Sequence, residues 1–346
     1  MNCETEGLEG ELAGFAAITP ERVLDAVEEA LNARCNGVLR PLPSYINRVY
    51  SVDLASGEQV VAKFYRPERW SKEAILEEHA FVKECQDEEI PVIAPMLLAN
   101  GRTLGEVADV SFAVFPKRGG RPIEPADPGN SLWQRLGALL ARVHQIGERQ
   151  TAPARLRLHP YTTTVADLEY LLDGTFLEAR EAQRLEQFGM ALFERIVPLF
   201  ENTEIIRLHG DCQHTNVLER PDTGLMLIDF DDMLNGTPVQ DLWMLLPGRL
   251  AESRIEMQQM LDGYETFRAF DYRTLRLIEP LRAMRMTYYL AWCARQAHDV
   301  AFMQNHPGWG TRAFWATELT ELEVQLDVIE QCECDDDFKN KGGLLC

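Results

Sequence analysis

The chain has 346 residues, of which 46% are hydrophobic, and this suits two ordinary globular domains or one bilobal enzyme. Lysine and arginine number 34 against 55 aspartates and glutamates, so the formal net charge is −21. This charge repels the phosphate backbone of nucleic acids and anionic lipid surfaces. We therefore expect no nucleic acid and no membrane among the partners.

The cysteines and the N-terminal residues indicate the compartment. Eight cysteines are scattered without CxxC spacing, so we expect reduced thiols. The start, MNCETEGLEGELAG, is acidic and lacks a basic segment followed by an apolar one, and no uncharged apolar run approaches the roughly 20 residues of a membrane span. We expect a cytoplasmic protein with a disordered acidic start and a flexible acidic tail over residues 333–346.

Residues 44–65, SYINRVYSVDLASGEQVVAKFY, have strand-like composition on both sides of a Ser-Gly turn, which predicts an antiparallel hairpin. Three apolar side chains share one face of its second strand: Val60, Ala62 and Phe64. Lys63 lies on the opposite face, inside an apolar strand where an unpaired ammonium group is costly. We therefore expect Lys63 to have a partner or a ligand.

A helix is predicted over KEAILEEHAFVKEC, residues 72–85, by the spacing of its apolar side chains. Two further short strands are expected in residues 91–101 and 107–116, followed by the flexible Gly-Gly-Arg-Pro of 119–122. We place a boundary here, so that residues 1–118 form an N-terminal lobe.

From residue 119 to 332 the pattern predicts a mostly helical lobe, with LMLIDF as its clear strand. The first helix begins near Ser131 and ends near Gly147, a residue type that suits a helix end. Five more helical segments are expected, near 163–172, 178–200, 253–269, 272–299 and 311–331.

The most informative segment is IIRLHGDCQHTNVLERPDTGLMLIDFDD, residues 205–232. Phosphoryl transfer from ATP needs an aspartate that orients the attacking hydroxyl and accepts its proton, and oxygen ligands that hold Mg²⁺ against the phosphates. Asp211, Asn216 and Asp229 can supply these groups, because the turn between two apolar stretches returns Asp229 to the loop that carries the other two. Any one of these residues alone is more often a solvated loop residue or a helix cap.

The pattern HGDxxxxN, a short hairpin and then hhDhD resembles the aminoglycoside phosphotransferase and choline kinase superfamily, a branch of the protein-kinase-like fold. The resemblance implies an α+β, bilobal fold with a small antiparallel-sheet N-lobe and a larger, mostly helical C-lobe. It implies that Asp211 is the catalytic base, that Asn216 is a metal ligand and that Asp229 is the catalytic, metal-binding aspartate. His209 is similar to a histidine that braces the loop.

Nucleotide-binding residues follow from the same resemblance. Lys63 resembles the lysine that contacts the α- and β-phosphates, and its partner is expected to be Glu78 or, failing that, Glu77. The sequence has neither GxGxxG nor GxxxxGK[ST], so Ser44 and nearby backbone N–H groups are expected at the phosphates.

Phe115-Pro116-Lys117 resembles the hinge whose backbone binds adenine. Because proline has no N–H, Phe115 and Lys117 are expected to serve there.

Longer segments resemble one family within this superfamily, the bacterial stress response kinases (SrkA/RdoA). They are SYINRVY, RPERWSKEAILEEH, RLHGDC, DDMLNGTPVQDLWMLL and IEPLRAMRMTYYLAW. This resemblance implies an ATP- and Mg²⁺-dependent Ser/Thr protein kinase that autophosphorylates and acts in stress survival, and we expect a monomer. The family's loop is HGDCHAGN, whereas this chain has HGDCQHTN. We favour a tolerant loop over an altered substrate preference.

Two further features have open interpretations. Asp241 resembles an aspartate that braces the catalytic loop, and a plain helix cap is comparably plausible. A helical face carries five large side chains, for which we favour core packing with snorkelling arginines: Arg282, Arg285, Tyr288, Tyr289 and Trp292.

Three functions compete at this point. The first is a protein kinase, and the second is a kinase of small alcohols such as an aminoglycoside, choline or homoserine, since one fold hosts all these acceptors. Acidic residues near Asp229 and the net charge suit a cationic small molecule. The third, a pseudokinase acting through interactions, ranks last because Asp211, Asn216 and Asp229 are all present.

Overall fold

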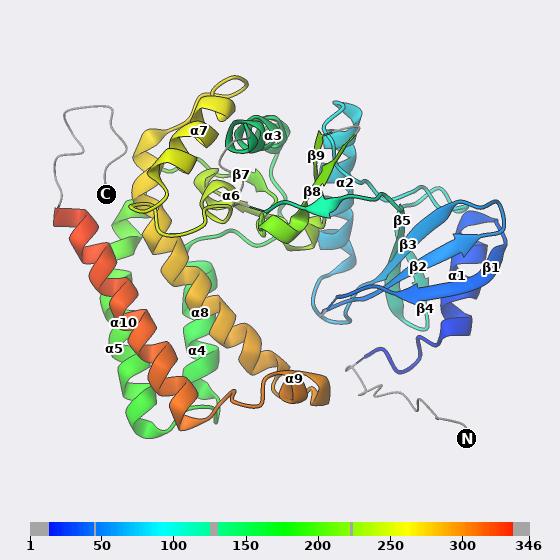
Figure 1. Cartoon of the computed structure of the whole chain (residues 1–346). Helices are drawn as coiled ribbons and strands as arrows, with labels where there is room; N and C mark the ends of the chain where they lie inside the picture. The colour runs from blue at the N-terminus through cyan, green and yellow to red at the C-terminus, as the bar shows by residue number, and fades with distance from the viewer. Residues whose placement is uncertain (1–13, 45, 125–130, 222–223, 335–346) are drawn as a thin grey trace. The chain divides into compact units, whose positions relative to one another are not determined.

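The computed structural model describes residues 14–44, 46–124, 131–221 and 224–334 (Figure 1). Residues 1–13 of the expected acidic start and nearly all of the expected tail lie outside this range. The chain divides into two compact units. The sheet unit comprises residues 1–76, 94–117 and 293–309, and the helical unit comprises residues 77–93, 118–292 and 310–346. The boundary expected after residue 118 stays a prediction, and two short segments, 77–93 and 293–309, lie outside such a simple division.

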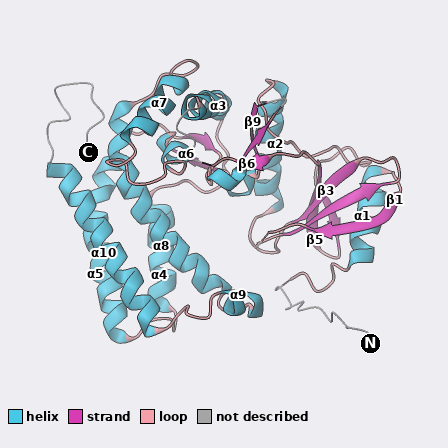
Figure 2. Cartoon of the chain, in the orientation of Figure 1, coloured by secondary structure: helices cyan, strands magenta, loops and turns pink. Residues whose placement is uncertain are grey.

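The sheet unit contains a five-stranded antiparallel sheet in the order β1-β2-β3-β5-β4. Its strands are β1 (Cys35–Pro41), β2 (Arg48–Leu54), β3 (Gln59–Phe64), β4 (Gly105–Val107) and β5 (Val110–Pro116). Helix α1 (Pro20–Leu31) and helix α9 (Val300–Asn305) belong to the same unit. Figure 2 distinguishes these strands from the helices by colour.

The predicted hairpin of residues 44–65 is confirmed as β2 and β3. Their register runs from Arg48 opposite Phe64 to Asp53 opposite Gln59, and Gly57 in the turn has φ +91°, which a glycine adopts without strain. The alternating apolar side chains of β3 are buried in one core with the apolar residues of α1.

Residues 91–101 and helix α1 differ from the predicted elements. Residues 91–101 form no strand, since Pro91 and Pro95 have no N–H to donate to a ladder, and only an isolated bridge at Val92 is present there. Helix α1 is not predicted above, although Thr19 caps it and Pro20 occupies its first turn.

The helical unit holds the remaining elements, and all six predicted helical segments are confirmed. Its helices are α3 (Leu132–Gly147), α4 (Val165–Asp173), α5 (Ala179–Ile196), α6 (Val239–Trp243), α7 (Arg254–Tyr264), most of α8 (Ile278–Gln296) and α10 (Arg312–Cys334). Its strands are β6 (Arg121–Pro122), β7 (Ile206–Leu208), β8 (Val217–Arg220), β9 (Gly224–Leu227) and β10 (Leu234–Gly236). Short helical turns complete it: η1 (Pro160–Thr164), η2 (Val197–Phe200), η3 (His214–Asn216), η4 (Phe230–Asp232) and η5 (Tyr272–Leu277). Helices α5 and α10 lie side by side (Figure 1).

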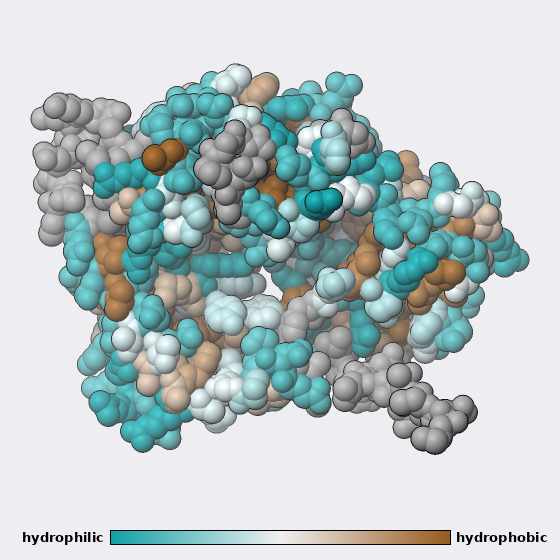
Figure 3. All heavy atoms as spheres, viewed as in Figure 1, coloured by the Kyte–Doolittle hydropathy of each residue, from teal (hydrophilic) through white to brown (hydrophobic). Residues whose placement is uncertain are grey.

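Helix α2 (Lys72–Asp87) begins in the sheet unit and continues into the helical unit after Leu76. The face drawn in Figure 3 is mostly hydrophilic, in keeping with the net charge of −21. No helix in the described residues is long and apolar enough to cross a membrane.

Helices α3 and α7 of the helical unit pack with their backbones close together. A Cβ atom added at Gly137 would lie 1.8 Å from the Met260 carbonyl oxygen, and one added at Gly263 would lie 1.9 Å from the Gln134 carbonyl oxygen. Only glycine allows two helix backbones to approach this closely.

We predict that Gly137→Ala lowers the free energy of unfolding by at least about 2 kcal/mol, because the methyl group must push α7 away. Urea denaturation followed by circular dichroism measures the change. Gly308→Ala is the matched control, since a Cβ there meets nothing within 4 Å, and its effect should stay within about 0.5 kcal/mol. Equal stability of the two variants would contradict the close approach.

Candidate active site

The predicted catalytic loop follows β7 and begins with a turn that only glycine can make. Gly210 has φ +84°, and a Cβ atom there would lie 2.1 Å from the Asp232 carbonyl oxygen. The loop therefore passes directly over η4. This packing places Asp211 on the loop immediately after the turn.

Asp241, on α6, holds the backbone of this loop. Its carboxylate accepts hydrogen bonds from the His209 N–H at Oδ2 and from the Gly210 N–H at Oδ1, both 2.9 Å long. His144 Nε2 lies 3.1 Å from the same Oδ2 atom, and His144 Nδ1 lies 2.9 Å from the Tyr264 hydroxyl. Asp241 is thus a brace of the loop and not a cap of α6, whose N-cap is Pro238.

The pKa of Asp241 shows that the carboxylate is well accommodated. Complete burial acts to raise this pKa, but hydrogen bonding to His144, the charges of the nearby histidines and the Gly210 N–H act against it. The hydrogen bonds and the histidine charges together outweigh the effect of burial, so the pKa of Asp241 lies below its ordinary value. The charged carboxylate therefore contributes to stability at neutral pH.

His209 connects the loop to the strand that precedes Asp229. Its Nε2 donates to the Ile228 carbonyl oxygen (2.8 Å), and its Nδ1 accepts the Asp211 N–H (3.3 Å). The ring also lies 4.5 Å, centre to centre, from the buried ring of Phe230. These contacts match the structural role that the resemblance implies.

Asp211 is held from three sides. Its Oδ2 accepts from Gln213 Nε2 (3.1 Å) and from Asn216 Nδ2 (3.4 Å), while its Oδ1 accepts from Arg285 Nη2 (2.7 Å). The Asp211 side chain is 14% exposed, so an incoming group can still reach it.

Asn216 is oriented by the same loop. Its side-chain Nδ2 donates to the Asp211 backbone carbonyl oxygen (2.9 Å), and the Asn216 backbone carbonyl oxygen accepts the Ile228 N–H (2.9 Å). With the amide nitrogen committed to the loop, the Oδ1 atom is the group that the side chain offers to a metal.

Asp229 directly follows Ile228 in the chain and is exposed. Its backbone is left-handed, with φ 61° and ψ 68°, a conformation that costs a non-glycine residue about 1–3 kcal/mol and that clusters at functional sites. The pinned Ile228 on one side and the buried Phe230 on the other enforce it. The structure thus brings the loop of Asp211 and Asn216 to the strand end that carries Asp229.

An amide oxygen and a carboxylate are hard oxygen ligands, which fits Mg²⁺ held jointly by protein and phosphate oxygens. The described residues contain no cluster of three or more His, Cys, Asp or Glu suited to hold a metal by themselves. A site that relies on Asn216, Asp229 and substrate oxygens is compatible with this finding.

Four of the remaining predicted site residues belong to the sheet unit. Lys63 lies on β3, Ser44 lies in the loop before β2, and the two expected hinge residues lie at or directly after the C-terminal end of β5. Lys63 is 7% exposed on β3, with its Nζ 5.3 Å from the centre of the Tyr65 ring. Ser44 is exposed in the loop between β1 and β2, where Tyr45 lies outside the described residues.

Of the expected hinge residues, Phe115 and Pro116 end β5 and Lys117 follows directly after it. The Lys117 N–H donates to the Gln59 carbonyl oxygen of β3 (3.2 Å), whereas the Val114 carbonyl accepts the Met96 N–H (2.7 Å) on the opposite edge. Because strand residues alternate in direction, the backbone N–H and C=O groups of Phe115 also point to β3. The carbonyl group of Pro116 points to the opposite edge of β5, away from β3.

Glu78 belongs to the helical unit and is almost fully buried. Its Oε2 accepts from Arg155 Nη2 (2.9 Å), and Arg155 Nη1 donates to the Asp231 carbonyl oxygen (2.8 Å). Glu77 instead accepts the backbone N–H of Ala154 (2.9 Å). Lys63 lies in the other unit, so its pairing with either glutamate stays a prediction.

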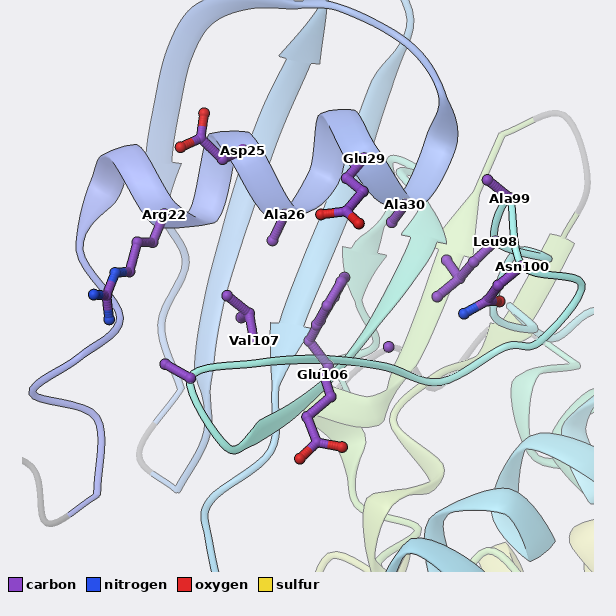
Figure 4. A pocket seen from close by; sticks show the side chains of 13 residues that line it. Arg22, Asp25, Ala26, Glu29, Ala30, Leu98, Ala99, Asn100, Glu106 and Val107 are labelled. Carbon is purple, nitrogen blue, oxygen red and sulfur yellow. The ribbon is translucent and has the colours of Figure 1, made fainter.

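A cavity of about 650 Å³ lies elsewhere in the sheet unit, between α1, β4 and residues 98–100 (Figure 4). Asp25 and Glu29 of α1 and Glu106 of β4 are among its lining residues. None of the predicted site residues lines this cavity.

Sequence reasoning missed Arg285 and Arg155. The packing interpretation of the 282–292 face fits Arg282, which lies over the Trp243 ring at 4.8 Å, but it is wrong for Arg285. The sequence indicated only that two arginines share one helical face. It did not indicate which of the two reaches the site.

Comparison with known proteins identifies relatives over nearly the whole chain. Residues 38–278 match the model of the phosphotransferase enzyme family. A stress response kinase A from Escherichia coli (strain K12) is 38% identical over 325 residues, which cover 92% of this chain and 95% of that protein. A protein named serine/threonine protein kinase RdoA, from Salmonella typhimurium, is 35% identical over 325 residues, which again cover 92% of this chain and 95% of that protein.

Solved structures share the fold at low sequence identity. An amicoumacin kinase in complex with AMP-PNP, Ca²⁺ and Ami superposes with a TM-score of 0.69 at 21% identity, covering 90% of this chain and 93% of that one. A microcompartment-associated aminopropanol kinase gives 0.65 at 18% identity, covering 90% and 97%. The predicted α+β, protein-kinase-like fold and the family resemblance are thereby confirmed.

We predict that Asp241→Asn lowers the free energy of unfolding by about 3 kcal/mol at pH 7, because an amide cannot accept from both loop N–H groups. The wild-type carboxylate has a lowered pKa, so its contribution is complete above its unfolded pKa of about 4 and is lost as the pH falls through the folded value. The difference between the two proteins should therefore shrink below about pH 4. Urea titrations at several pH values measure it, and a pH-independent difference would contradict the argument.

Proposed function

We propose that this chain, which belongs to the phosphotransferase enzyme family and within it to the stress response kinases, transfers the γ-phosphate of ATP to serine and threonine hydroxyls of proteins, itself included. The observation that carries the proposal is the fixed loop on which Asp211 and Asn216 are hydrogen-bonded to each other, while the Asn216 backbone carbonyl oxygen accepts the N–H of Ile228, the residue before Asp229. We further propose that it acts as a cytoplasmic monomer in the bacterial stress response.

Asp211 is the group that orients the attacking hydroxyl and accepts its proton. Its carboxylate is aimed by Gln213 and Asn216 on one oxygen, so it need not search for a productive orientation. Asn216 Oδ1 and the Asp229 carboxylate would hold Mg²⁺. When bound, this ion would neutralise charge on the phosphate oxygens.

The nucleotide itself would be held by the sheet unit. Lys63 would contact the phosphates, with Glu78 as its counter-charge, and Ser44 would cover them from its exposed loop. Phe115 and Lys117 remain the proposed adenine-binding positions by resemblance, although the backbone groups of Phe115 and the N–H of Lys117 point to β3. The Pro116 carbonyl, on the outer edge of β5, is the acceptor best placed for the adenine amino group.

The competing function is a kinase of small alcohols. It is favoured by the names of the solved structures with the same fold, which include an aminopropanol kinase and a spectinomycin phosphotransferase. One fold hosts both acceptor classes, so the acceptor must be determined by experiment.

We predict that purified protein with Mg²⁺ and radiolabelled ATP labels itself and myelin basic protein, and that Asp211→Ala lowers transfer about 10²–10⁴-fold because the base is gone. Nucleotide binding, measured by calorimetry, should persist in the variant. Asp173→Asn, an exposed carboxylate at the end of α4, is the charge-matched control and should keep full activity. Rapid labelling of choline or kanamycin with no labelled protein would instead support the small-alcohol kinase.

We predict a separate effect for the proposed metal ligands. Asn216→Ala and Asp229→Asn should each raise the Mg²⁺ concentration for half-maximal activity roughly 10-fold or more, since even second-shell partners of a metal are worth 10–100-fold in affinity. Activity titrations against Mg²⁺ at saturating ATP measure this shift, with Asp173→Asn again as control. An unchanged Mg²⁺ requirement would remove that residue from the metal site.

A further inference from the structure

Arg285 projects from α8 onto the proposed catalytic base. Its Nη2 donates to Asp211 Oδ1 at 2.7 Å, and its side chain is 36% exposed. A guanidinium–carboxylate contact of this length is a charge-assisted hydrogen bond. The other oxygen of Asp211 is already occupied by Gln213 and Asn216, so Arg285 lies on the side of the carboxylate that faces away from the loop's own donors.

Most of the hydrogen-bonding capacity of Arg285 is unused. A guanidinium carries five N–H donors, and in the described part of the chain its one recorded polar partner is Asp211. The ring of Tyr288 lies 5.1 Å away and supports the side chain without consuming a donor. Exposed, charged donors beside the base can therefore receive a group from the acceptor substrate.

Arg282, one turn earlier on the same helix, makes a useful contrast. Its Nε donates to Glu279 (3.2 Å) and its Nη2 to the Gly248 carbonyl oxygen (2.9 Å), and only 23% of its side chain is exposed. Arg282 is thus committed to the protein, whereas Arg285 is committed only to the base.

We propose that Arg285 forms an anion-binding subsite beside the acceptor hydroxyl, which takes the carboxylate or phosphate of a residue flanking the acceptor serine or threonine. This inference rests on the function proposed above. Arginine binds both oxyanions through paired N–H donors, and its fixed charge repels a cationic acceptor. The subsite therefore selects acidic acceptors and disfavours cationic alcohols.

The simpler alternative is that Arg285 is only a counter-ion that positions Asp211. The two roles differ in kinetics. A positioning residue affects every acceptor alike through kcat, whereas a binding subsite affects KM, and only for acceptors that carry the anion.

The test uses the full-length protein and three peptides that share one acceptor serine, flanked by glutamate, phosphoserine or lysine. For the wild type we expect kcat/KM at least about tenfold higher with either anionic flank than with lysine. Arg285→Gln should bring these ratios to within about twofold of one, mainly through KM, and Arg285→Lys should keep part of the preference because it keeps the charge. Comparison of the glutamate and phosphoserine peptides shows which oxyanion is preferred.

Arg180→Gln is the matched control, since Arg180 is exposed on α5 and the same charge is removed away from Asp211. It should retain the wild-type ratios, and circular dichroism should show each variant folded. A wild type that phosphorylates peptides with no charge preference, or an Arg285→Gln variant slowed equally on all three, overturns the subsite alone. A wild type that labels no peptide but phosphorylates choline overturns both the proposed function and the subsite.

Discussion

The buried carboxylate of Asp241 is the constraint on which the candidate site depends. A charge removed from water must be fully hydrogen-bonded, and here consecutive N–H groups of the catalytic loop supply two of the bonds. The loop can therefore adopt only a backbone that points both N–H groups inward. His144 fixes the carboxylate from α3. The position of Asp211 is in this way coupled to the core of the helical unit, where α3 meets α7.

A second set of buried charges anchors α2 to the helical unit. Arg155 joins Glu78 to the carbonyl of Asp231, two residues after the exposed Asp229, and Arg207 joins Glu84 to the end of α3. Both arginines are buried, so removing the glutamate partner would leave a buried charge unpaired, at a cost greater than the pair itself contributes. The part of α2 from Glu77 onward, which belongs to the helical unit, is thus fixed to the same turn as the proposed metal ligand.

The sequence predicted those features that depend on local pattern. Alternation in residues 44–65 and helical spacing in 131–147 were sufficient, because burial of one face dictates both. The strand predicted over residues 91–101 was wrong, because this apolar run is typical of a strand but its prolines prevent one. The partners of Asp211 and Glu78 were beyond prediction for a different reason: Arg285 and Arg155 lie 74 and 77 residues away along the chain. Such contacts follow from tertiary packing, which spacing does not encode.

Net charge and local charge lead to opposite expectations for the acceptor. The chain carries −21, and acidic residues near Asp229 suggested a cationic substrate, yet the Arg285 guanidinium contacts the proposed base, Asp211, at 2.7 Å. Exposed charges more than about 10 Å away are largely screened at physiological salt, so most of the −21 affects how fast a charged acceptor approaches and little else. At the base itself the contact charge dominates, because Coulomb energy falls with distance and the partly buried pair is less well screened. In the proposed subsite, the arginine that α8 places beside Asp211 therefore outweighs the composition of the surface in selecting the acceptor.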